Sequence, residues 1–182
     1  MKTLLKYYSL LLLLFKLPFF ILAQSFTNND GFTITEIIIK DSLPAKELIN
    51  RAIAWAQKKH PKYEKENAVG GTAKIELDAK FKIKPKELNP PHDYTGVISM
   101  HVKIEVKDGK YRYTINKVHH TADNGKNSGG DITKDIPECG TMLLPDMTWK
   151  KIKGEAIRQA NVLAEDLKDA MSIPVKTTSE DW

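Results

Sequence analysis

One stretch constrains the fold of this chain more than any other. Two runs of alternating apolar and polar residues, 96–107 and 110–120, flank the dipeptide Asp108-Gly109. An Asp-Gly pair tolerates the positive φ angles of a type I′ turn, so it predicts a tight β-hairpin. The predicted pairs are Lys107 with Lys110, Val106 with Tyr111, Glu105 with Arg112, Ile104 with Tyr113, Lys103 with Thr114, Val102 with Ile115, and His101 with Asn116. A slip of one residue would expose the whole apolar set, so this register is strongly specified.

The N-terminal segment 1–23 has the layout of a secretory signal peptide. Two lysines give it a positive start, an apolar run follows, and Ala23 ends the run at the expected cleavage site before Gln24. Lys16 interrupts the run, so its uninterrupted apolar length falls short of the ~20 residues that span a bilayer. The alternative is an uncleaved signal anchor. With cleavage, we expect a secreted or periplasmic protein without a membrane span.

The basic charge of the chain comes largely from that segment. The formal net charge is +5, from 28 Lys+Arg and 23 Asp+Glu. Residues 1–23 contain three lysines and no acid, which leaves 25 basic against 23 acidic residues, a net charge of +2. Binding to naked nucleic acid requires the neutralisation of many phosphates, so we expect no nucleic-acid partner.

The hydrophobic periodicity predicts two further strands and two helices. We expect a strand at 32–40, a helix between Pro44 and Pro61, a strand at 73–83 and a helix at 148–172. The strand at 73–83 alternates strictly between apolar and charged residues, as in a sheet with one dry and one solvated face. Both helices have one apolar stripe. The sequence therefore predicts an α+β fold of two layers, an antiparallel β-sheet with two helices on one face.

The composition also predicts the irregular parts of the chain. The segment 121–147 is rich in Gly and Asn and has no periodicity, which indicates a long loop. The tail at 173–182 is expected to be loose. Asp41 and Ser42 precede the first helix and offer side-chain oxygens that can cap its N-terminus.

Three stretches, in this order, resemble a known family. They are SLPAKELINRAIAWAQK after the first strand, the Gly70-Gly71 step, and KDGKYRYTINKV at 107–118. Over roughly 34–120 the chain is similar to the secreted bacterial family called domain of unknown function 4468, which has a TATA-binding-protein-like fold. The resemblance implies a core domain at 32–120 with this fold and a Bacteroidetes-type envelope setting. It implies no catalytic residues, and DNA binding does not follow from a fold.

Three histidines are the candidate metal ligands. In the predicted register His101 lies on the polar side of the hairpin and His119 on the apolar side, while His119 and His120 point to opposite faces. No HExxH motif or paired Cys/His spacing is present. A calcium loop starting at Asp123 would have glycine and lysine at its third and twelfth positions, where ligands are required. We therefore predict no metal site and no cofactor.

Cys139 is the only cysteine, so the chain cannot form an internal disulfide. It is either a buried thiol or, with His119 or His120, a nucleophile, and the spacing of these residues specifies no nucleophile. The sequence contains no phosphate-binding loop and no Gly-x-Ser-x-Gly elbow. We therefore assign no catalytic residue.

The solvated face of the sheet is the candidate contact surface. In register it has five fixed positive charges against three negative ones, which favours a partner of mixed charge. The predicted contact residues are Lys74, Lys80, Lys82, His101, Lys103 and Arg112. This pattern indicates a non-enzymatic domain that binds an envelope partner or ligand. Two alternatives stay open: an enzyme that uses the region from His119 to Cys139, and a purely structural accessory domain.

We expect the exported protein to begin at Gln24, because the apolar run ends at the small residue Ala23. Intact-mass measurement of protein collected from the periplasm or medium checks this expectation. A mass that still includes residues 1–23 would contradict it and support the signal anchor.

Overall fold

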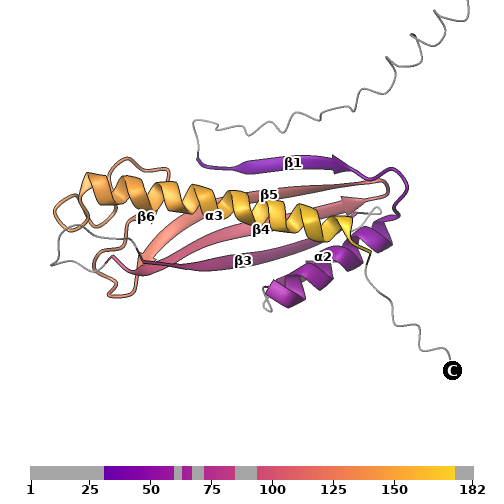
Figure 1. Ribbon diagram of the computed structural model, residues 1–182, viewed down its shortest axis with the longest axis horizontal. Coiled ribbons are helices and arrows are strands. Elements are labelled where there is room, and N and C mark those ends of the chain that lie inside the picture. Colours follow the sequence, from indigo (N-terminus) through magenta and orange to yellow (C-terminus); the bar gives the residue numbers. More distant parts are fainter. Residues whose placement is uncertain (1–30, 60–62, 67–71, 85–93, 175–182) are drawn as a thin grey trace, which may run out of the picture.

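The computed structural model describes residues 31–59, 63–66, 72–84 and 94–174 (Figure 1). Within these ranges the elements are β1 (Ile34–Ile39), α2 (Ala45–Lys59), β2 (Tyr63–Glu66), β3 (Ala73–Ile83), β4 (Gly96–Lys107), β5 (Lys110–Ala122), β6 (Gly130–Asp131) and α3 (Asp146–Ser172). The expected signal peptide with its Ala23-Gln24 cleavage site, the Gly70-Gly71 step and all but the first two residues of the tail lie outside the described residues.

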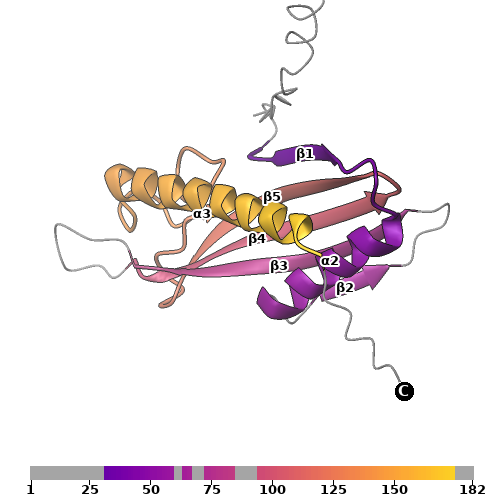
Figure 2. The same ribbon diagram turned by 45° about the vertical axis from the view of Figure 1, so that its right-hand side comes forward.

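The strands form one antiparallel sheet with two helices on one of its faces. The strand order is β1-β5-β4-β3-β2, and β6 pairs with β5. In Figures 1 and 2, α2 and α3 both lie in front of the same side of the strands. The predicted α+β architecture is therefore confirmed. The core lies between the helices and the sheet, and its largest fully buried side chains include Trp149, Tyr111, Tyr113, Leu48 and Met100.

The predicted hairpin register is confirmed at all seven pairs, from Lys107 opposite Lys110 to His101 opposite Asn116. Its apolar face is dry, because Val102, Ile104 and Val106 of β4 have no exposed surface. The alternation that specifies the register therefore also determines which face of the sheet the helices cover.

Beyond His101 the hairpin contains a β-bulge that the alternating pattern does not predict. The register shifts between Ser99 and His101, so that Lys117 and Val118 together oppose Met100. Lys117 has a φ of 49°, a left-handed conformation that is uncommon for residues other than glycine. The extra residue reverses the alternation, so that Val118, His120 and Ala122 are buried.

The turn of the hairpin also caps the first helix. The backbone N–H of Ala45, at the start of α2, donates to Oδ1 of Asp108 at 2.7 Å. Asp41 and Ser42, the predicted caps, are exposed and neither side chain has a hydrogen bond in the part of the chain described. Asp41 and Ser42 are predicted as caps because they precede the helix in the sequence. In the fold, the carboxylate of Asp108, from the β4–β5 turn, takes this place at the start of α2.

Two backbone hydrogen bonds hold this turn against the β1–α2 connection. The N–H of Lys40 donates to the carbonyl of Gly109 at 2.7 Å, and the N–H of Gly109 donates to the carbonyl of Leu43 at 2.9 Å. Gly109 has a φ of 73°, which a residue with a side chain rarely adopts, but Asp108 has no positive φ, so the tight turn is not of the predicted type I′. The Asp-Gly pair therefore connects β1, α2 and the central hairpin at one corner of the domain.

Polar contacts also join the two helices, although they are far apart in sequence. The guanidinium of Arg51 in α2, only 6% exposed, donates to the carbonyl of Met171 near the end of α3 at 2.9 Å, and also to Glu47. The indole N–H of Trp55 donates to Asp166 at 2.8 Å. Trp55 is buried, as its place on the apolar stripe predicts. The second helix is thereby fixed in position on α2 as well as on the sheet.

The segment 121–147 differs from the loop that its composition predicts. Strand β5 extends to Ala122, β6 lies within the segment, and α3 begins at Asp146 instead of 148. A Cβ atom on Gly129 would lie 2.2 Å from the ring of Trp149, so this glycine is required for close packing against the helix. The indole N–H of Trp149 donates to the carbonyl of Lys134 at 3.0 Å. Glycine here therefore serves packing as well as turning.

Replacing Asp108 with alanine should lower the free energy of unfolding by about 0.5–2 kcal/mol, the usual cost of losing an N-cap oxygen. Asp41→Ala should change it by less than ~0.5 kcal/mol, because an exposed side chain without such a bond contributes little. Urea unfolding of the two variants checks this. Equal losses for both would contradict the cap assignment, and Asp108→Asn, which keeps an acceptor oxygen, should lose less than Asp108→Ala.

Candidate binding face of the sheet

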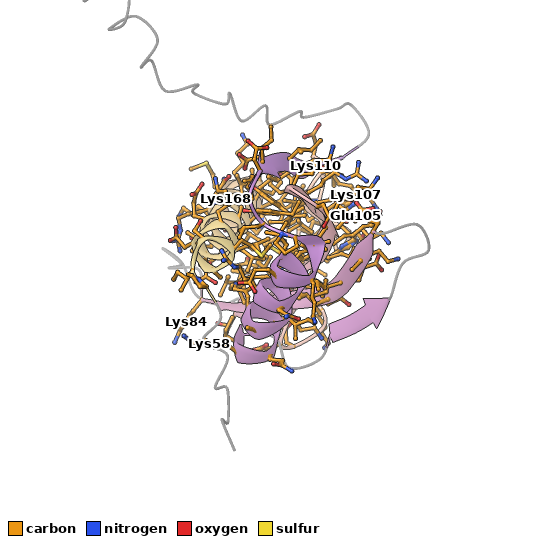
Figure 3. The ribbon with its side chains drawn as sticks, turned by 90° about the vertical axis from the view of Figure 1, so that its right-hand side faces the viewer. Lys58, Lys84, Glu105, Lys107, Lys110 and Lys168 are labelled. Carbon is orange, nitrogen blue, oxygen red and sulfur yellow. The ribbon has the colours of Figure 1, made fainter. Side chains whose placement is uncertain are left out.

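The side of the sheet opposite the helices is uncovered by any described element. We call it the open face, formed by the outward side chains of β1, β3, β4 and β5. Figure 3, which views the domain along its length, shows Glu105, Lys107 and Lys110 on this side and Lys168 on the helix side. Strand register places all six predicted contact residues on the open face, since β3 and β4 pair Lys74 with Glu105 and Lys80 with Ser99.

The cations in the middle of this face each contact a carboxylate. The carboxylate of Glu105 accepts from Arg112 at 2.7 and 2.9 Å, and Lys103 Nζ lies 3.1 Å from it. Lys74 Nζ lies 3.2 Å from Glu76. The remaining pairs are His101 with Asp78 at 3.1 Å, His101 with Glu76 at 3.8 Å, and Lys82 with Asp123 at 2.7 Å. We call residues 74, 76, 103, 105 and 112 the paired band.

The electrostatics of Glu105 reflect this arrangement. Partial burial among the neighbouring side chains acts to raise the pKa of its carboxyl group, but hydrogen bonds from Arg112 and Lys103 outweigh burial and hold the pKa below its ordinary value. Glu105 therefore remains ionised and keeps two cations in place. The paired band is ordered by its own contacts before any partner arrives.

The open-face lysines that lack an ion pair within the described residues lie near the two ends of the face. Lys80 and Lys117 line a pocket of about 440 Å³ together with Asp78, Ser99, Met100, His101 and His119. Lys107 and Lys110 line a second pocket, of about 320 Å³, beside the hairpin turn, with Ile37, Thr72, Glu105, Tyr111 and Arg112. Of the six predicted contact residues, only Lys80 belongs to this unpaired set. The lysines without an ion pair therefore line the two hollows of the face.

The prediction that His101 and His119 lie on opposite faces is wrong. The bulge at Lys117 reverses the alternation, so that His119 pairs with Ser99 and lines the same pocket as His101. A backbone carbonyl is the hydrogen-bond partner of His119, whose Nδ1 lies 3.0 Å from the oxygen of Lys117. Sequence reasoning missed Lys117 and His119 as members of the face because no Gly, Asn or Asp stands at 117 to indicate a left-handed residue.

His120 lies on the other side of the sheet, in the core. It has no exposed surface, its Nδ1 accepts from the N–H of Gly129 at 3.1 Å, and its ring packs 6.4 Å from that of Trp149. Burial lowers the pKa of this imidazole, and a backbone contact to Tyr94 opposes the effect. The residue therefore acts as a neutral packing group that connects β5 to the segment before α3.

Cys139 lies in an environment that does not activate a thiol. Burial raises the pKa of its thiol, and the nearby carboxylate of Glu138 raises it further. A nucleophilic Cys–His pair requires the opposite shifts, a lowered thiol pKa and a protonated imidazole. The Cys139 and His120 environments are thus both unsuited to such a pair.

Within the described ranges, no group of three or more His, Cys, Asp or Glu side chains is arranged to hold a metal ion. The segment from Asp123 uses its polar groups internally instead, since Oδ1 of Asn124 accepts from the N–H groups of Lys126 and Asn127 at 3.0 and 3.1 Å. In the same described part of the chain, no helix combines the length and hydropathy that crossing a bilayer requires.

Comparison with known proteins identifies the fold. Residues 35–121 match the family model "Domain of unknown function (DUF4468) with TBP-like fold", which agrees with the resemblance seen in the sequence over 34–120. No curated protein matches the chain. The match covers β1 to β5, to within one residue at each end, together with α2, and it ends before β6 and α3.

Two crystal structures share the architecture. A TBP-like protein from Parabacteroides distasonis has a TM-score of 0.59 and 16% identity, over 83% of this chain and 99% of its own. A DUF4468 family protein from Bacteroides ovatus has a TM-score of 0.54 and 11% identity, over 86% of this chain and 94% of its own. At such identities the likeness extends to the fold alone.

Replacing Glu105 with glutamine should lower the free energy of unfolding by about 1 kcal/mol near neutral pH, because two hydrogen-bonded cations lose their anion. The pKa of Glu105 is lowered in the folded state, so its contribution is present above the ordinary value of 4.5 and is lost as pH falls through the folded value. The difference between the two proteins should therefore shrink in acid. Thermal melts across this pH range check it, and a difference independent of pH would contradict it.

Proposed function

We propose that this chain, whose residues 35–121 form a DUF4468 domain with a TBP-like fold, is an exported non-enzymatic domain that binds an envelope partner or ligand on the open face. The observation that carries the proposal is the arrangement of charge on that face. Every cation of the paired band has an acidic partner within the band. By contrast, the lysines that line the two pockets, Lys80 with Lys117 and Lys107 with Lys110, have no ion pair in the described chain. These two ends are the places where an incoming anionic group gains most.

The chemistry of the face favours a partner of mixed charge that presents acidic groups at two separated points. Arg112 and Lys103 are already held by Glu105, and the paired band as a whole has three cations against two carboxylates, a net charge of only +1. Naked nucleic acid is disfavoured, since its affinity depends on many unneutralised cations. The fold's likeness to TBP adds nothing to this, because function belongs to sites and not to folds.

We propose a secreted or periplasmic location on the basis of residues 1–23. Their positive start, apolar run and final Ala23 support export, and the remaining chain has a net charge of only +2. An envelope partner follows from that location, because an exported domain meets proteins and ligands of the same compartment.

The alternatives differ in what the open face does. In a purely structural accessory domain the cross-strand pairs only stabilise the sheet, at roughly 0.2–1 kcal/mol each. An enzyme that uses the region from His119 to Cys139 would need an activated group there, and burial raises the pKa of the thiol. Binding through the open face is the function that the charge arrangement supports best.

The test is charge reversal at the two hollows. We expect Lys80→Glu with Lys117→Glu, or Lys107→Glu with Lys110→Glu, to reduce recovery of a specific envelope partner about tenfold or more, the equivalent of 1.4 kcal/mol. The melting midpoint should stay the same, since these lysines have no ion pair to lose. Quantitative pull-down from envelope extract, together with thermal melts, measures both effects.

Lys150→Glu with Lys151→Glu is the matched control, because both lysines are exposed on α3, on the opposite side of the domain. Its recovery of the partner should equal that of the wild type. Unchanged recovery by both open-face variants would overturn the proposal and favour the structural alternative.

A further inference from the structure

Strand β1 ends the sheet at one edge, and half of its backbone groups point away from β5. The N–H of Lys40, just after β1, donates to Gly109 on the hairpin. Alternation along an antiparallel strand then directs the backbone groups of Ile34, Glu36 and Ile38 toward β5. The N–H and C=O groups of Thr35, Ile37 and Ile39 therefore point outward, along an edge that no described strand covers.

The side chains of these outward residues make this edge unusual. Ile37 and Ile39 are 53% and 54% exposed, and among β1, β3, β4, β5 and β6 they are the only large exposed hydrophobic residues. The other edge strand, β2, has the sequence Tyr-Glu-Lys-Glu, and charged residues of this kind discourage edge pairing. The β1 edge has neither a lysine nor a proline nor a bulge between Ile34 and Ile39. It is therefore an edge suited to pairing with another strand.

We propose that β1 pairs antiparallel with β1 of a second copy of this chain, about a twofold axis at Ile38. In this register Ile37 lies opposite Ile39 of the partner subunit, twice, as hydrogen-bonded pairs that each exchange both N–H···O bonds. Glu36 lies opposite Lys40 of the partner subunit, also twice. Because the interface is isologous, it closes as a dimer in which both β1 edges are used.

Charge selects this register from its neighbours. In an antiparallel pair, the residue numbers of opposite residues add up to a constant. The outward N–H and C=O groups of the two copies face each other only if this sum is even, so the possible registers differ by two in the sum. One step down, Ile37 faces its own copy, Glu36 faces Ile38, and Lys40 faces Ile34, so neither charge has a counterpart. A second step down places Glu36 opposite Glu36, which is repulsive. The proposed register alone combines an isoleucine cluster with two pairs of opposite charge.

Glu36 and Lys40 both retain capacity for the new contact. The carboxylate of Glu36 accepts from Tyr113 Oη at 2.5 Å and lies 3.5 Å from Lys168, and a carboxylate has about four acceptor sites. Lys40 Nζ donates once, to Ser172 at 3.2 Å, and an ammonium group has three donors. Pairing therefore adds to the existing contacts of these residues without requiring that they break.

The dimer is independent of the proposed binding function, because its contacts are at the edge of the sheet. Thr35, Ile37 and Ile39 also belong to the open face, so pairing would join two open faces into one continuous surface. A partner that spans both copies would then contact both open faces at once.

Cysteine cross-linking tests the register directly. In a Cys139→Ser background, Ile38→Cys should form a covalent dimer with oxidised glutathione, because residues opposite each other in a non-hydrogen-bonded pair have Cα atoms about 4.5 Å apart, within disulfide range. Ile37→Cys should cross-link only in the neighbouring register, and Thr35→Cys in neither. Preferential dimerisation of Ile38→Cys supports the proposal, and equal or faster cross-linking of Ile37→Cys or Thr35→Cys overturns it.

Solution mass provides a second test that does not depend on a partly buried cysteine. The purified chain should change from the mass of one chain to that of two as its concentration rises, and Ile37→Lys should raise the dissociation constant about tenfold or more. Ile157→Lys, an exposed position on α3, is the matched control and should leave dimerisation unchanged. A single-chain mass at every concentration, which is also the result expected if another protein's strand occupies the edge, overturns the proposal.

Discussion

The Asp108-Gly109 turn is the contact on which the architecture depends. The side chain of Asp108 caps α2, and the backbone of Gly109 is hydrogen-bonded to the β1–α2 connection. The turn also determines the register of the two longest strands. Because an antiparallel register decides which side chains face the core, this one turn specifies the dry face, the open face and the place where the first helix begins. Elements that are separated by more than sixty residues meet at this dipeptide, and Gly109 gives it a backbone angle that residues with a side chain rarely adopt.

The sequence predicts most of this architecture because its signals are local and repeated. Alternation over β3 and β4 gives the faces, and helical spacing places Trp55 and Trp149 in the core. What it does not predict is set by long-range contacts or by single backbone angles. The cap from Asp108 replaces Asp41 because only the folded chain brings that carboxylate near α2. The bulge at Lys117 is not predicted, because lysine is not a residue type that favours a left-handed conformation. It reverses the face to which each later residue of β5 is assigned.

The consequence of that bulge is greatest at the candidate site. All six predicted contact residues lie before it or on neighbouring strands, and all are on the open face. The pocket near the bulge, however, includes Lys117 and His119, which the uninterrupted alternation would assign elsewhere. The hairpin register predicts the pair of Glu105 with Arg112, but it does not predict that the same carboxylate also binds Lys103, a neighbour on its own strand. Residue type therefore locates the face, and geometry decides which of its charges are available.

The buried bond between Arg51 and the carbonyl of Met171 has a consequence for the order in which the chain acquires its structure. Helix α2 cannot make this hydrogen bond until the last turn of α3 has been synthesised. The segment 35–121 contains β1 to β5 and α2, but without α3 Arg51 lacks its Met171 acceptor, and the apolar surface that α3 covers is exposed to water. The packing of α2 and the sheet is therefore completed only when α3 is in place.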